Sequence, residues 1–319
     1  MHEYEFSTWL LSAQTPSIQY QALLDLCDYP TTDTRVIKAQ QAIMKKGPVP
    51  AILGHQTKSG QWHGERSYYT PKYVSTHWSM MLLTELSIDG GNAHYRQGVR
   101  YMAEATADEL DERLDTNALG LGCFWGNLLR YTLHAGKVDE DQVEKLIDYL
   151  TRDLQNGFCR CPHNQGYACA WGVVRALWGL AAISQGQRPR NTDRAITQGV
   201  KFLLESYRLV EANYPAPGQG GSNPLWFKLN FPLFYQVDLL FALRVLDELG
   251  QLDHPGVQTT LDWLAQRRGR NGRWIGSSPF RQRTWRELGD RDETNRWVSL
   301  YASRILRHAG RLPVFEIMA

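Results

Sequence analysis

Net charge, long apolar runs and cysteines are all scarce in this chain of 319 residues. The formal net charge is +2, and Lys and Arg are scattered rather than gathered in a basic stripe, which argues against nucleic-acid binding. No apolar run approaches the ~18 residues that a membrane span needs, so we expect no transmembrane segment. The first ten residues are acidic where a secretory signal is basic. Five cysteines, an odd number, favour reduced thiols, and we expect a cytoplasmic protein without a disulfide framework.

Three common catalytic motifs are also missing from the sequence. There is no Gly-x-x-x-x-Gly-Lys-Ser/Thr phosphate loop, no Gly-x-Ser-x-Gly nucleophile turn and no His-Glu-x-x-His metal motif. These absences remove the support for a kinase, an α/β-hydrolase or a zincin. We find no β-strand pattern and no interdomain linker, and the Gly/Pro-rich stretch 212–224 is expected to be a long loop inside one domain.

What the chain does contain is a repeated helical pattern. Six apolar segments each carry an aromatic residue near their start and continue with aliphatic residues at helical spacing; these aromatics are Tyr20, Trp78, Trp125, Trp171, Tyr235 and Trp297. Between them lie segments with one apolar stripe, which start at Tyr95, Val143, Ile196 and Val257, with looser relatives at Arg35 and in residues 3–12. A helix that is apolar all round must be enclosed, whereas a one-sided helix can face water. Six enclosed helices ringed by outer helices predict an all-α fold, an α6/α6 toroid, as a single domain over residues 1–319.

Two glycine-x-tryptophan turns support a family resemblance. They are Gly60-Gln61-Trp62 and Gly272-Arg273-Trp274, and each precedes an inner segment. Together with the segments 69–78 and 231–238, these turns resemble the repeat of squalene–hopene cyclases and protein prenyltransferase β-subunits, from about residue 50 to the C-terminus. The resemblance implies a toroid with an apolar central pocket that takes an isoprenoid or a similar lipid-like ligand, with acid or metal-assisted chemistry.

The chain also departs from that family. Terpene cyclases of the matching class carry an Asp-x-Asp-Asp acid motif, and the nearest approach here is the segment 290–293. The Asp-x-Cys pair and later His that hold zinc in protein prenyltransferases are missing as well. Two other hypotheses therefore stay open. The chain is either a ligand-binding or protein-interaction module without chemistry, or a carbohydrate-active α/α toroid, which needs two carboxylates on one rim.

Asp238 is the first candidate for a general acid. It stands three places after the aromatic of its segment, where the five other inner segments have aliphatic residues. Burial raises the pKa of a carboxyl group, which suits a proton donor. The alternative is a structural carboxylate that caps a helix or forms an ion pair with Arg175, Lys228 or Arg244.

Asp292 and Glu293 are the second acidic candidates. They lie just before the last inner segment, where the resemblance implies a proton donor in the position of Asp292. Asp238 with Asp292 or Glu293 is also the carboxylate pair that a carbohydrate-active enzyme would require. The alternative is ordinary acidic capping of the helix that starts near Thr294.

Cysteine and histidine residues suggest a zinc site. Cys123 and Cys169 each lie two residues before the aromatic of an inner segment, and the loop before Cys169 adds Cys161 and His163. Neighbouring helices pack about 8–10 Å apart, so thiolates at matched heights and a loop His can converge on zinc. The alternative is that the cysteines are small buried hydrophobic residues.

Aromatic and basic residues near the starts of the inner segments are candidates for substrate binding. An aromatic lining stabilises a carbocation or a cationic ligand, and Lys72 could hold a diphosphate together with helix N-termini. We therefore expect the binding rim at the N-terminal ends of the inner helices. The alternative is packing between helix layers. The candidates are Tyr69, Lys72, Tyr73, His77, Trp78, Trp125, Trp171, Tyr235 and Trp297.

Overall fold

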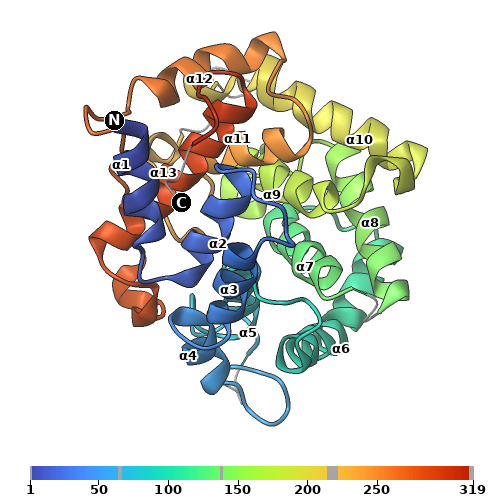
Figure 1. Ribbon diagram of the computed structural model, residues 1–319. Helices are drawn as coiled ribbons and strands as arrows, with labels where there is room; N and C mark the ends of the chain where they lie inside the picture. The colour runs from blue at the N-terminus through green and yellow to red at the C-terminus, as the bar shows by residue number, and fades with distance from the viewer. Residues whose placement is uncertain (1, 64–66, 137–138, 214–221, 316–319) are drawn as a thin grey trace.

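The computed structural model describes residues 2–63, 67–136, 139–213 and 222–315. Within these ranges the chain is built from helices joined by turns and short 3-10 segments, and it contains isolated β-bridges but no β-strand (Figure 1). The all-α prediction is confirmed. Of the loop predicted over 212–224, residues 214–221 lie outside the described ranges.

The helices alternate between two series along the chain. The first series, which matches the segments predicted to be enclosed, comprises α2 (Pro16–Asp25), α5 (Thr76–Glu85), α7 (Gly122–His134), α9 (Ala170–Ala181), α11 (Leu239–Glu248) and α13 (Arg291–His308). The second series comprises α1 (His2–Leu11), α3 (Thr34–Ile43), α6 (Ala93–Asp115), α8 (Glu140–Gln155), α10 (Arg190–Lys201) and α12 (Gln258–Ala265). A short additional helix, α4 (Pro48–Gly54), follows α3.

Burial differs between the two series as the sequence pattern predicts. Helix α9 buries Ala170 and every residue from Gly172 to Leu180. Helix α10 buries one face only, made by Thr192, Ala195, Ile196, Gly199 and Val200. The large continuous core extends from Phe6 to Phe315 and includes residues of both series.

Each helix of the first series contacts the next one. Contacts join α5 to α7, α7 to α9, α9 to α11, α11 to α13, and α13 to α2. Helix α2 in turn reaches the end of α5, because Ser17 Oγ donates a hydrogen bond to the Leu86 carbonyl at 2.6 Å and Gln21 Nε2 donates one to the Glu85 carbonyl at 3.0 Å. The contacts followed from α5 through α13 and α2 therefore lead back to α5.

The two glycine-x-tryptophan turns have the same local structure. Gly60 and Gly272 have φ of 93° and 76°, a backbone region that favours glycine. The indole Nε1 of Trp62 donates to the Ile52 carbonyl at 2.6 Å, and that of Trp274 donates to the Leu264 carbonyl at 2.9 Å. Each tryptophan's backbone N–H donates to a hydroxyl of the following first-series helix, Thr76 or Ser299. The sequence repeat thus corresponds to a structural repeat.

One first-series helix begins later than the sequence pattern predicts. Helix α11 starts at Leu239, and Tyr235 lies before it in a loop. The reason is the N-cap: Asp238 Oδ1 accepts a hydrogen bond from the Phe241 backbone N–H at 2.8 Å, which fixes the first turn of the helix there.

No helix in the described ranges is both long and apolar enough to cross a lipid bilayer.

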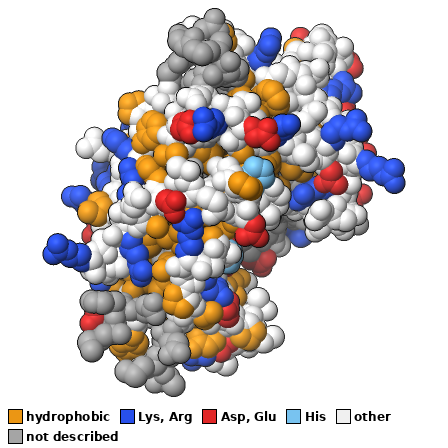
Figure 2. Space-filling view, turned by 90° about the horizontal axis from the view of Figure 1, so that it is seen from above, with side chains coloured by type: hydrophobic (Ala, Val, Ile, Leu, Met, Phe, Trp, Pro, Cys, Tyr) orange, Lys and Arg blue, Asp and Glu red, His pale blue; other side chains and the backbone are white. Residues whose placement is uncertain are grey.

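On the face of the molecule shown in Figure 2, cationic, anionic and apolar side chains are mixed.

Candidate functional site

A cavity of about 440 Å³ opens at the C-terminal ends of the first-series helices. This volume lies in the range of small-molecule sites. All six first-series helices contribute to its lining, through Asp25, Glu85, Arg130, Trp178, Glu248 and Arg304 among others. Five of these six side chains are charged, and α9 contributes the ring of Trp178. The site therefore lies at the opposite helix ends from the predicted rim.

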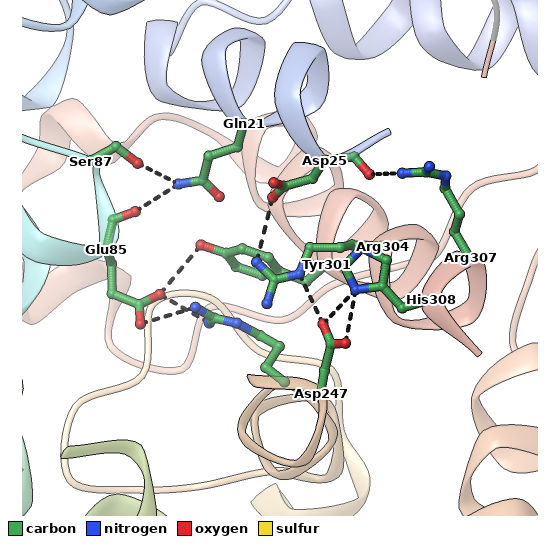
Figure 3. A network of polar contacts seen from close by, with 10 residues as sticks. Gln21, Asp25, Glu85, Ser87, Asp247, Tyr301, Arg304, Arg307 and His308 are labelled. Atoms are coloured by element: carbon green, nitrogen blue, oxygen red, sulfur yellow. Dashed lines mark hydrogen bonds and ion pairs between the residues drawn. The ribbon is translucent and has the colours of Figure 1, made fainter. Parts of the chain in front are cut away.

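Glu85 and Arg244 form the most buried ion pair in the wall of this cavity. The guanidinium of Arg244 donates to both carboxylate oxygens of Glu85, at 3.0 and 3.2 Å, and the Tyr301 hydroxyl donates to the same carboxylate at 3.3 Å (Figure 3). Burial opposes the charged carboxylate, but the Arg244 guanidinium holds the pKa of Glu85 below its usual value. The Nε–H of Arg244 has no acceptor within the described ranges.

Arg304 of α13 lies between two carboxylates. Its guanidinium is 3.4 Å from Asp25 of α2 and 3.2 Å from Asp247 of α11, and Asp247 also contacts Nδ1 of His308 at 2.8 Å (Figure 3). Burial raises the pKa of Asp25 although Arg304 opposes this effect. Asp25 thus lines the cavity as a carboxyl group that holds its proton more readily than usual.

A third ion pair joins α7 to α11. Arg130 Nη1 is 2.6 Å from Glu248 Oε2, and it also donates to the Trp178 carbonyl at 3.2 Å. The Arg130 guanidinium lies 4.9 Å from the centre of the Trp178 ring. Arginines near helix C-termini also complement the helix dipoles, so this end of the molecule offers fixed donors and acceptors next to an aromatic face.

Asp238 does not line this cavity. It is fully buried, and its second carboxylate oxygen accepts hydrogen bonds from the backbone N–H and the side-chain amide of Asn230, at 2.7 and 2.8 Å. Burial raises the pKa of Asp238 to about 6. It borders a separate cavity of about 10 Å³, room for roughly one water, which Glu85 and Arg244 also line. The contacts of Asp238 are those of a helix cap that also anchors the preceding loop.

Asp292 and Glu293 lie in the first turn of α13, which Asp290 caps. Asp292 is half exposed and ion-paired with Arg296 at 2.9 Å. Glu293 is buried and accepts hydrogen bonds from the backbone N–H groups of Gln14 and Thr15, at 2.9 and 3.0 Å, directly before α2. Glu293 therefore joins α13 to the start of α2, and neither carboxylate lines the 440 Å³ cavity.

The predicted zinc ligands are brought only partly together. The thiols of Cys161 and Cys169 hydrogen-bond to each other, which lowers the pKa of Cys161 to about 6 and raises the pKa of Cys169. Cys123 is close enough to interact electrostatically with Cys161, and burial raises the pKa of Cys123 to about 12. His163 is exposed in a 3-10 turn. Across the described ranges, no group of three or more His, Cys, Asp or Glu side chains is arranged to hold a metal ion, so zinc stays a prediction of the sequence.

Most of the predicted aromatic candidates form one connected cluster near the N-terminal ends of α5 and α9. Trp78 lies at its centre, with its ring 4.6–6.0 Å from the rings of Tyr69, Tyr73, His77 and Tyr235. Tyr235 also contacts Trp171 at 6.2 Å, and Lys72 Nζ lies 5.4 Å from the Tyr69 ring and 5.0 Å from the Tyr235 ring. We call these seven residues the N-terminal aromatic cluster.

The two remaining tryptophans pack elsewhere. Trp125 contacts the Tyr149 ring at 5.5 Å, and Trp297 stacks on Phe231 at 4.4 Å. Trp78, Trp125 and Trp297 are fully buried, which fits the packing alternative. Burial lowers the pKa of His77 to about 3, so its imidazole is neutral at pH 7.

The residues that line the cavity are not among the predicted site residues, although the sequence carries a signal for them. A charged residue interrupts the apolar pattern one to three turns after the aromatic in all six inner segments, at Asp25, Glu85, Arg130, Arg175, Arg244 and Arg304. All of these except Arg175, which is fully buried, line the charged cavity of the structure. Compared with known proteins, the chain matches no protein-family model, no curated protein and no solved structure.

Proposed function

We propose that the chain is an α6/α6 toroid that binds a small hydroxyl-rich molecule of the saccharide class in the cavity at the C-terminal ends of its inner helices. The succession of contacts from α2 through α13 and back supports the ring, as do the two equivalent glycine-x-tryptophan turns. The relation to terpene cyclases and prenyltransferases remains part of this proposal and rests on the sequence repeat. The residues that line the cavity indicate the class of ligand.

Hydrogen-bonding capacity favours the saccharide among the ligands that the sequence suggests. The cavity presents amides from Gln21 and Gln40, hydroxyls from Thr84 and Ser87, and the three ion pairs. A saccharide hydroxyl both donates and accepts a hydrogen bond, so it can replace the water on these groups. An isoprenoid chain cannot, and covering polar groups without hydrogen bonds costs about 1–3 kcal/mol for each group. This cavity therefore supports the carbohydrate hypothesis better than the isoprenoid one.

The N-terminal aromatic cluster supports the isoprenoid ligand as a second candidate. Trp171, Tyr235, Tyr69 and Lys72 are only partly buried there, so aromatic faces and one ammonium group are accessible. An isoprenoid diphosphate could place its apolar chain on these rings and its phosphates on Lys72. This second ligand would bind at the N-terminal ends of the inner helices, where the sequence predicts the binding rim. The chain would then either bind the ligand or also act on it.

Binding measurements on two variants separate the candidates. Arg130→Ala alters the C-terminal cavity, and Lys72→Ala alters the N-terminal aromatic cluster. We expect isothermal titration calorimetry to detect binding of a member of a panel of glucose, xylose, mannose, glucosamine and uronic-acid oligosaccharides. Arg130→Ala should weaken this binding at least tenfold, and Lys72→Ala should leave it unchanged. Binding of farnesyl diphosphate that is lost in Lys72→Ala, without any saccharide binding, would favour the second candidate instead.

A further inference from the structure

We infer that Asp25 and Glu248 are the acid–base pair of a glycoside hydrolase centred on the C-terminal cavity. This inference rests on the proposed saccharide binding and adds a reaction to it. It assigns a different carboxylate pair from the one that the sequence suggests, because none of the three suggested carboxylates lines this cavity. Asp238 caps α11, Asp292 forms a surface ion pair, and Glu293 accepts hydrogen bonds from two backbone N–H groups.

The fold places the two carboxylates on either side of one helix. Asp25 ends α2 and Glu248 ends α11, and both of these helices contact α13. Arg304 of α13 interacts electrostatically with both carboxylates. Both line the 440 Å³ cavity, and their side chains are 27% and 20% exposed, so a bound molecule can reach them.

Asp25 and Glu248 differ from Glu85 and Asp247 in having an oxygen to spare, and they differ from Asp89, a further carboxylate of the lining, in being partly buried. Glu85 uses both oxygens on Arg244, and Asp247 is held by Arg304 and His308 outside the cavity lining. Asp25 contacts Arg304 through Oδ2 alone, and Glu248 contacts Arg130 through Oε2 alone. In the part of the chain that the structure describes, Asp25 Oδ1 and Glu248 Oε1 have no hydrogen-bond partner. These two oxygens are therefore available to a substrate and to a water molecule.

The surroundings of Asp25 and Glu248 suit a saccharide, and they give one carboxyl group the role of acid and the other the role of base. Arg130 and Arg244 line the same cavity, and their guanidinium groups can donate hydrogen bonds to saccharide oxygens. Burial favours the protonated form of Asp25, which is the form of a general acid. Arg130 fixes one oxygen of Glu248 at 2.6 Å and leaves the other to accept a proton. Glycoside hydrolysis uses two carboxyl groups that flank the scissile bond, one as the acid and the other as the base or nucleophile.

The reaction needs no reactant besides the glycoside and water. Asp25 donates its proton to the glycosidic oxygen as the bond between that oxygen and the anomeric carbon breaks. The oxygen of a water molecule bonds to the anomeric carbon, and the water gives one proton to Glu248. Two saccharides leave, each with a new hydroxyl group, and proton exchange with solvent restores Asp25 and Glu248.

Release of reducing ends from the same oligosaccharide panel tests the inference. The wild-type chain should cleave the oligosaccharide that it binds, and Asp25→Asn and Glu248→Gln should each lower kcat about 100-fold or more. Asp148→Asn is the matched control, because Asp148 forms an exposed ion pair with Arg152 on the outer helix α8. Its rate should equal that of the wild type.

Two further readouts separate a chemical role from a structural one. The wild-type rate should fall as pH rises through the pKa of Asp25, because the acid must be protonated, and Asp25→Asn should lose this dependence. Azide should restore turnover to Glu248→Ala with a glycosyl azide as product. Saccharide binding without cleavage, or unchanged rates in both variants, would overturn the acid–base pair and leave the binding proposal standing. Failure to bind any saccharide would overturn both.

Discussion

The two ends of the first-series helices differ sharply in chemistry. Near the N-terminal ends of α5 and α9, the aromatic cluster packs rings against one another with Lys72 beside them. At the C-terminal ends, three ion pairs surround a 440 Å³ cavity. The first end carries the most regular residues of the repeat, and the second carries the residues that interrupt it. The regular aromatic positions therefore serve mainly packing here, and the charged residues near the C-terminal ends of the inner segments mark the candidate site.

The largest expected effect is the loss of stability when a buried aromatic residue of the repeat is removed. Trp297→Ala removes a fully buried ring that stacks on Phe231, and such changes cost about 3–5 kcal/mol. Trp171→Ala removes a half-buried ring and should cost clearly less. Urea unfolding followed by circular dichroism measures both. Equal losses in the two variants would contradict the distinction between core and rim aromatics.

A second prediction concerns the buried pair at the charged end. Glu85→Ala leaves Arg244 buried without its carboxylate, which should destabilise the chain by about 3–5 kcal/mol. The control is Asp148→Asn, which breaks an exposed pair and should cost at most about 1 kcal/mol. Similar urea midpoints for the two variants would contradict the argument that the Glu85–Arg244 ion pair is buried.

The pH dependence of stability tests the role of Asp238. Burial raises its pKa in the folded state from the ordinary value of 3.8 to about 6, so its contribution to stability is fully present below pH 4 and is lost as pH rises to about 6. Asp238→Asn cannot titrate at this position. The stability of wild type relative to this variant should therefore decrease between pH 4 and 6, as measured by urea unfolding at each pH. A difference that stays constant or grows with pH would contradict the burial argument.

The smallest effect is a difference in thiol reactivity. The hydrogen bond from Cys169 lowers the pKa of Cys161, whereas burial raises the pKa of Cys123 and Cys159. Iodoacetamide at pH 7 should therefore label Cys161 first, as peptide mass spectrometry can show. Faster labelling of Cys123 would contradict the thiol arrangement.

Much of the helical pattern follows from the sequence, because apolar periodicity reports burial directly. The enclosed α9 and the one-sided α10 both match their segments. The start of α11 does not, because the cap formed by Asp238 outweighs the aromatic at Tyr235. The location of the cavity depends on which side chains meet between α2, α11 and α13, and single-segment periodicity carries no such information. Asp25 interrupts an apolar segment in the sequence, but neither Asp25 nor Glu248 shows there which side chains it will meet.

A crystal structure of the chain with its tightest-binding oligosaccharide tests the central claim most directly. The account predicts a sugar ring in the cavity at the C-terminal ends of the first-series helices, between Asp25 and Glu248 and within hydrogen-bonding distance of Arg244. A sugar bound instead on the N-terminal aromatic cluster, with the charged cavity holding only water, would contradict it.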